Sequence, residues 1–166
     1  MTDTVVGIDI GGTSVRAVAL DLENNEVKDQ LNTSSSDNGP ELIRILSSVV
    51  KELEKRSKND FSAIGLGVAG LANKSGVVRY SPNLPNLIEF PIGHELEKKL
   101  GIRVSVGNDA TVATIAEWKI GAGRTSDNFV LATLGTGIGT GFVVDGHLLL
   151  GSSGFAGEAG HMTIDA

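Results

Sequence analysis

Residues 8–14 read Ile8-Asp9-Ile10-Gly11-Gly12-Thr13-Ser14, an acid followed by two adjacent glycines and two hydroxyl side chains. Apolar residues dominate 4–10 and alternate with others over 14–21, which predicts a strand, a tight glycine turn and a second strand. Glycine tolerates positive φ and lets another backbone or a ligand come close. The backbone N–H groups and hydroxyls of such a turn can then face an anion such as phosphate. A plain β-hairpin with a Gly-Gly turn is the alternative interpretation.

Composition limits the classes of protein to consider. The 166 residues suffice for one domain with a core, or for one domain and part of another. A net charge of −6 without a basic patch argues against nucleic acid as the main partner. The chain has no cysteine, so it can build neither a disulfide nor a thiolate metal site. No membrane-length apolar run or signal peptide is visible, which predicts a cytoplasmic protein without a membrane partner.

The first half of the chain predicts a mixed sheet. An edge strand over 26–33 would complete an antiparallel βββ meander. Pro40 predicts a helix start with Asn38 or Gly39 as its cap, and apolar residues then recur at helical spacing. The buried strand expected over 62–68 should run parallel to the first strand, because a helix crosses between them. Its Gly-x-Gly-x-x-Gly pattern lies inside a strand with no helix after it, so we do not interpret it as a dinucleotide fingerprint.

Loops punctuate the middle of the chain. A backbone-lined site is expected at Ala69-Gly70, and a short strand over 76–80. The loop Ser81-Pro82-Asn83-Leu84-Pro85-Asn86 is of a length that is often functional in compact domains. The periodicity then predicts a helix over 92–100, a strand over 102–106 and a helix over 110–120.

A second glycine hairpin echoes the first. Strands are expected over 129–134, 142–144 and 147–150, with a glycine turn over 135–141. This segment repeats the plan of 4–21, so the two hairpins could clamp one phosphate chain between them. The composition shifts at 121–127, which predicts one domain over 1–121 and the incomplete beginning of a second over 122–166.

Two acidic positions carry chemistry on this interpretation. Asp9 could hold a hydrated Mg²⁺ through water, and the alternative is a buried aspartate that forms the turn. Asn108 and Asp109 follow a buried strand and start a helix, where open α/β sheets place ligands. Asp109 there could accept a proton from a hydroxyl that attacks a phosphoryl group. Helix N-capping alone would also explain both residues.

Glu158 and His161 form the third candidate, because they lie three residues apart after a Gly/Ser loop and could converge on a polar ligand or a metal. A lone histidine is more often structural. We interpret His94 and His147 in that way.

Four motifs together resemble the ROK family of sugar kinases, in order and in spacing. They are Asp9-Ile-Gly-Gly-Thr-Ser, Asn108-Asp109-Ala, Leu134-Gly-Thr-Gly-Ile-Gly-Thr-Gly and Glu158-Ala-Gly-His161, and they span essentially the whole chain. Within the family the chain is most similar to the glucokinases, partly through Ser81-Pro-Asn-Leu-Pro. The resemblance implies the actin-like ATPase (ribonuclease H-like) α/β fold, with two similar domains around a cleft.

The resemblance also implies roles for individual residues. Asp109 would be the general base on the 6-hydroxyl of the sugar. Sugar binding would fall to Gly70, Asn83, Asn108, Asp109, Glu158 and His161. ATP and its Mg²⁺ would be bound by Asp9, Gly11, Gly12, Thr13, Gly135, Thr136, Gly137 and Gly139. His161 is also the family's zinc ligand, beside three cysteines of a downstream motif.

The chain departs from the family by lacking that cysteine motif, so zinc could bind only if another segment supplied it. It resembles the first half of a family member. The implied function is ATP-dependent phosphorylation of a hexose, most simply glucose to glucose 6-phosphate, by a homo-oligomer (dimer or tetramer) when complete. The alternatives are a non-catalytic sugar- or nucleotide-binding fragment and a sugar-responsive regulator of the same family. Regulators carry a helix-turn-helix before the Asp-Gly-Gly-Thr stretch, and only eight residues precede Asp9 here.

Overall fold

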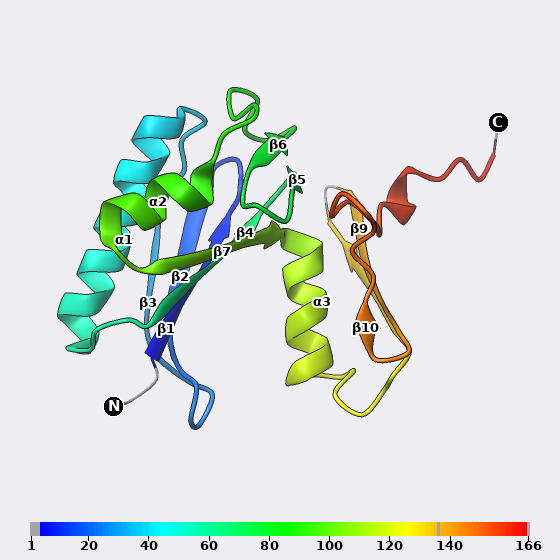
Figure 1. Ribbon diagram of the computed structural model, residues 1–166, viewed down its shortest axis with the longest axis horizontal. Helices are drawn as coiled ribbons and strands as arrows, with labels where there is room; N and C mark the ends of the chain where they lie inside the picture. Colours follow the sequence, from blue (N-terminus) through cyan, green and yellow to red (C-terminus); the bar gives the residue numbers. More distant parts are fainter. Residues whose placement is uncertain (1–3, 136, 166) are drawn as a thin grey trace. The chain divides into compact units, whose positions relative to one another are not determined.

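The computed structural model describes residues 4–135 and 137–165 (Figure 1). The chain forms two compact units, Met1–Gly107 and Asn108–Ala166. The domain boundary expected between residues 121 and 122 lies inside the second unit and stays a prediction for the complete protein. No helix among the described residues is both long and apolar enough to span a membrane.

A five-stranded mixed sheet organises the first unit, with the strand order β3-β2-β1-β4-β7. Its strands are β1 (Thr4–Ile10), β2 (Ser14–Asp21), β3 (Glu26–Ser34), β4 (Ala63–Val68) and β7 (Arg103–Asn108). β1 pairs antiparallel with β2, and β2 antiparallel with β3, so the expected meander is confirmed. β4 lies parallel to β1, with Val6 opposite Ile64, as the helical crossover predicts. The actin-like α/β fold expected from the sequence is confirmed by this arrangement.

Two helices cover the buried face of this sheet: α1 (Gly39–Ser57) and α2 (Ile92–Leu100). Asn38 caps α1, because its side chain accepts a hydrogen bond of 3.0 Å from the N–H of Glu41. Gly101 follows the last residue of α2 in a left-handed conformation (φ 71°), and its N–H donates to Glu97 O. The shared core consists of fully buried aliphatic side chains from helices and strands, among them Ile10, Val15, Leu42, Leu46, Leu53, Ile64, Leu66, Ile92 and Leu96.

The segment between β4 and α2 adds a small two-stranded sheet, formed by β5 (Leu71–Ala72) and β6 (Val78–Tyr80). β5 was not predicted, because two residues are too few to show a strand period. The loop that follows β6 is packed against the rest of the unit. Leu84 and Leu87 are both fully buried in the core of the unit.

The second unit packs one helix on a three-stranded antiparallel sheet of order β10-β9-β8. Its elements are α3 (Asp109–Lys119), β8 (Phe129–Leu134), β9 (Ile138–Val144), β10 (His147–Leu148) and the 3₁₀ turn η1 (Ala159–His161). The predicted strand over 142–144 is too short, since β9 begins at Ile138, opposite Leu134 of β8. Residues 138–141 were expected in the turn because of their glycines, but their backbones pair with β8. β10 is two residues shorter than expected.

Candidate functional site

The first group of predicted residues lies at the carboxyl ends of β1 and β4. These strands run parallel, so the chain leaves both at the same edge of the sheet. After β1 the turn closes with a hydrogen bond of 2.9 Å from Gly11 N–H to Ser14 O. After β4, Ala69 N–H donates to Ile10 O at 3.2 Å. The Gly-Gly turn and the Ala69-Gly70 segment are therefore joined by the backbone.

Gly12 brings the predicted phosphate turn into contact with the predicted sugar loop. A Cβ built on Gly12 would lie only 2.8 Å from Asn83 O and 3.0 Å from Asn83 Cβ. The φ angles of Gly11 and Gly12 lie outside the left-handed region. Close approach of another backbone, and not a positive φ, is thus what requires glycine at position 12. Asn83 itself is exposed, as is Thr13 beside it in the turn.

Ser81 and Gly70 fix the base of the same loop. The Ser81 hydroxyl donates to Ala69 O at 2.6 Å and accepts a hydrogen bond of 3.1 Å from Leu84 N–H. Gly70 has φ +150°, and a Cβ there would lie 2.6 Å from Tyr80 O and 2.8 Å from Ser81 Cα. Gly70 therefore lies directly beneath the start of the loop, where a side chain would not fit.

Asp9 is exposed, unlike its neighbours Ile8 and Ile10, which face the core. In the sheet it lies opposite Arg16 of β2 and Gly67 of β4. The alternative of a buried aspartate is wrong as to burial, because Asp9 is an exposed residue of β1. The described residues contain no group of three or more His, Asp or Glu side chains that could hold a metal ion. A carboxylate in this position suits a hydrated cation bound through water.

The two residues of the predicted pair differ in their environment: Asn108 caps a helix, whereas Asp109 is exposed. Asn108 caps α3, with its Oδ1 accepting from Thr111 N–H at 3.1 Å. Asp109 Oδ1 accepts a local hydrogen bond of 2.8 Å from Ala110 N–H, and the residue is exposed. The capping interpretation therefore explains Asn108 and leaves the Asp109 carboxylate open to a ligand.

The second glycine hairpin packs against the start of α3. A Cβ on Gly139 would lie 2.9 Å from Ala110 Cβ, and one on Gly141 would lie 2.0 Å from Thr114 Oγ1. The hairpin backbone thus approaches the first turns of the helix, and it brings this hairpin close to the residue that follows Asp109. Gly135 and Gly137 at the tip are exposed with open space around them. Thr136 lies outside the described residues.

Glu158 and His161 are held on β9 by Thr140. The Thr140 hydroxyl accepts from Ala159 N–H at 3.1 Å and donates to Gly157 O. His161 Nε2 lies 3.7 Å from Glu158 Oε2, and both side chains are exposed. Residues 138–140 therefore connect the glycine hairpin, the start of α3 and the Glu158–His161 segment within one unit.

The sequence-predicted residues thus gather in two groups, one in each unit. The first comprises Asp9, Gly11, Gly12, Thr13, Gly70 and Asn83, and the second comprises Asn108, Asp109, Gly135, Gly137, Gly139, Glu158 and His161. Sequence reasoning missed the supporting roles of Ser81 and Thr140. Both lie inside quoted motifs, but their partners are 12 and 17 residues away, and no local pattern reveals these bonds.

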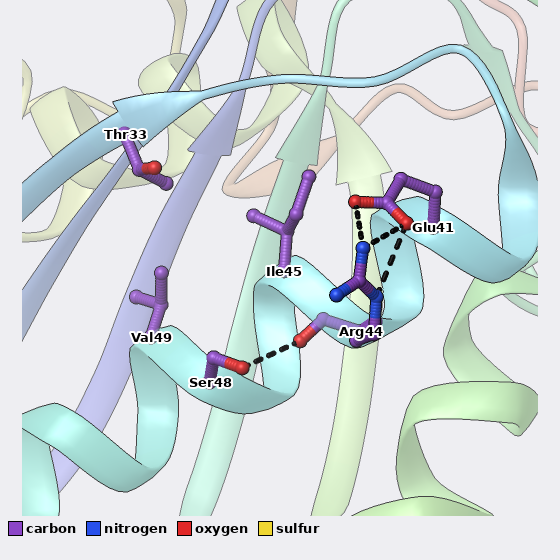
Figure 2. Close-up of a pocket in the computed structure, with 6 residues that line it drawn as sticks. All are labelled: Thr33, Glu41, Arg44, Ile45, Ser48 and Val49. Carbon is purple, nitrogen blue, oxygen red and sulfur yellow. Dashed lines mark hydrogen bonds and ion pairs between the residues drawn. The ribbon is translucent and has the colours of Figure 1, made fainter.

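A surface pocket lies elsewhere, between β3 and α1 (Figure 2). Its polar groups bond to one another: the Arg44 guanidinium pairs with Glu41, and Ser48 Oγ donates to Arg44 O at 3.0 Å. The hydrogen bond to the Glu41 carboxylate raises the pKa of Arg44 above its usual value. None of the sequence-predicted site residues lines this pocket, and we assign it no ligand. Its lining residues are Thr33, Glu41, Arg44, Ile45, Ser48 and Val49.

Comparison with known proteins gives concordant matches. A profile of the ROK family matches residues 5–166. A glucokinase from Thermotoga maritima is 34% identical over 163 residues, which is 97% of this chain and 51% of that protein. The xylose repressor of Bacillus subtilis is 32% identical over 96% of this chain and 42% of that protein.

Among solved structures, a ROK family glucokinase from Streptomyces griseus in complex with glucose and AMPPNP aligns with a TM-score of 0.87. It is 29% identical, and the match covers 98% of this chain and 51% of that one. The chain thus spans about half the length of the curated relatives that it matches.

Proposed function

The chain belongs to the ROK family, and we propose that the protein it represents phosphorylates a hexose with ATP, with glucose as the preferred substrate. The single observation that carries this proposal is the arrangement around β9. There residues 138–140 connect the exposed Asp109, a glycine hairpin whose tip carries no side chain at Gly135 and Gly137, and the Glu158–His161 pair. A base, a phosphate cradle and polar groups for sugar hydroxyls are the parts that phosphoryl transfer to an alcohol needs.

Each glycine turn suits the phosphate groups of a nucleoside triphosphate, because each presents backbone without side chains. Gly12 and Gly139 lie where a Cβ would collide with neighbouring atoms, and Gly135 and Gly137 are open to solvent. When bound, Mg-ATP supplies the transferred phosphoryl group and neutralises part of its charge. Asp9 would hold the hydrated cation through water, and the turn N–H groups would bind phosphate oxygens.

In the proposed reaction Asp109 accepts the proton of the attacking sugar hydroxyl. Its position at the first turn of α3 keeps the carboxylate on a rigid element, while Asn108 satisfies the helix N-terminus. Asn108, Glu158 and His161 would bind the other hydroxyls and orient the ring. The family resemblance gives Gly70 and Asn83 sugar-binding roles as well.

A second candidate function is sugar-responsive regulation of transcription, which the similarity to the Bacillus subtilis xylose repressor favours. The two functions differ in turnover, because a regulator would bind sugar without consuming ATP.

The test is ADP release by the complete protein with Mg-ATP and a panel of glucose, fructose, mannose and N-acetylated hexoses. The kinase proposal predicts sugar-dependent ADP release, highest with glucose. Sugar binding detected by calorimetry without ADP release from any hexose would overturn it and favour the regulator.

A further inference from the structure

Ser81 lies at a junction that the proposed reaction does not use directly. It is fully buried, and its hydroxyl bonds two segments at once, Ala69 O at the end of β4 and Leu84 N–H in the loop. Leu84 N–H also donates to Ser81 O at 3.3 Å, so the bond from the Ser81 hydroxyl to Ala69 O is the one that ties the loop to the segment after β4. The loop cannot move away from β4 without breaking a buried hydrogen bond.

These bonds belong to a closed ring of contacts. Ala69 N–H is bonded to Ile10 O, which precedes the Gly-Gly turn. The loop held by Ser81 carries Asn83, whose backbone lies against Gly12 of that same turn. The chain therefore returns to its starting point through Ile10, Ala69, Ser81, Asn83 and Gly12. Movement of the loop would therefore alter its contact with the turn, and movement of the turn would alter its contact with the loop.

We propose that Ser81 is a positioning residue that couples sugar binding at the Asn83 loop to phosphate binding at the Gly11–Thr13 turn. The inference rests on the proposed function, since it takes Asn83 as a sugar contact and the turn as a phosphate contact. The coupling acts in both directions. A sugar that orders the loop also orders the turn, and a phosphate group that orders the turn also orders the loop. Each ligand therefore raises the affinity for the other.

Ser47 supplies a matched control within the same unit. Its hydroxyl is also buried and also donates a hydrogen bond of 2.6 Å to a backbone carbonyl, that of Ile43 in α1. Ser47→Ala removes a buried bond from a hydroxyl to a carbonyl within α1, outside the ring of contacts. A difference between Ser81→Ala and Ser47→Ala thus reports positioning and not merely lost stability.

The first measurement is amide hydrogen exchange in the complete protein without ligands, which does not depend on its activity. Ser81→Ala is expected to speed exchange about tenfold at Leu84, which keeps only its longer bond to Ser81 O, and at Gly11, whose N–H closes the turn. Ser47→Ala leaves both segments at the wild-type rate. Faster exchange at Leu84 alone, with the turn unchanged, would overturn the coupling. Ser81→Cys, which keeps a weak donor of similar size, should give an intermediate rate and serves if the alanine variant does not fold.

The second measurement is sugar affinity by calorimetry with and without a non-hydrolysable ATP analogue. Wild type and Ser47→Ala should bind sugar more tightly in the presence of the analogue. Ser81→Ala should lose this enhancement, and its kcat/KM for sugar should fall about ten- to hundredfold, mainly through KM. An undiminished enhancement in Ser81→Ala would refute the proposal. Absence of phosphorylation by wild type would instead refute the proposed function, while the exchange comparison would still decide the coupling.

Discussion

Gly12→Ala tests the contact between the phosphate turn and the Asn83 loop most sharply. The new methyl would lie 2.8 Å from Asn83 O and 3.0 Å from Asn83 Cβ, whereas ordinary van der Waals contact begins at 3.4 Å. The loop or the turn must therefore retreat by roughly half an ångström, and such overpacking costs about 1–3 kcal/mol. The loop cannot yield easily, because Leu84 is buried in the core and Ser81 is bonded to Ala69.

Gly65→Ala is the matched control, since nothing lies within 4 Å of a Cβ at that position in β4. Alanine lowers the conformational entropy of the unfolded chain relative to glycine. The unfolding free energy of Gly65→Ala should therefore be unchanged or higher by about 0.4–1 kcal/mol. Urea unfolding should therefore rank Gly65→Ala above wild type or equal to it, and Gly12→Ala below. In the ADP-release assay, displacement of the turn should lower kcat/KM of Gly12→Ala about a hundredfold. The reasoning is refuted if Gly12→Ala matches Gly65→Ala in both stability and kcat/KM.

Two further predictions concern Thr140 and Asp21. Thr140→Val removes the hydroxyl that holds the Glu158–His161 segment on β9, so the KM for sugar should rise about tenfold with little change in the KM for ATP; equal changes in both constants would contradict a sugar-specific role. The hydrogen bond from Glu23 N–H, together with Lys28, holds the pKa of Asp21 below its usual 3.8. The ionised Asp21 carboxylate therefore stabilises the folded state above pH 4, and this contribution is lost as the pH falls through the lowered pKa. The measurement is the unfolding free energy as a function of pH. Below pH 4 it should fall less for Asp21→Asn than for wild type. An equal fall in both proteins would show that Asp21 has no such role.

The elements of this fold that could be predicted from the sequence follow local rules. Pro40 after Asn38 indicated the start of α1, and the Asn38 side chain does accept from Glu41 N–H. Gly101 follows the helix predicted over 92–100, and it adopts the left-handed conformation with which many helices end. These predictions succeed because capping depends on residues only three or four apart.

The elements that could not be predicted depend on distant partners. Glycines 139 and 141 indicated a turn, but they lie in β9, where α3 approaches too closely for side chains. The contact of Gly12 with Asn83 joins residues 71 positions apart, and neither position has a local pattern that reveals it. Motifs therefore located the candidate residues, whereas the packing that groups them came only from the structure.

The central claim is that the protein transfers a phosphoryl group to a sugar with Asp109 as the base, and Asp109→Asn tests it most directly. Asparagine keeps an oxygen to accept the Ala110 N–H bond, and the residue is exposed, so the unfolding free energy should change by less than about 0.5 kcal/mol. The measurement is kcat for glucose-dependent ADP release by the complete protein, with glucose binding followed by calorimetry. The account predicts a kcat lowered about 10²- to 10⁴-fold with glucose affinity nearly intact. A kcat within about threefold of wild type would contradict the assignment of Asp109 as the base.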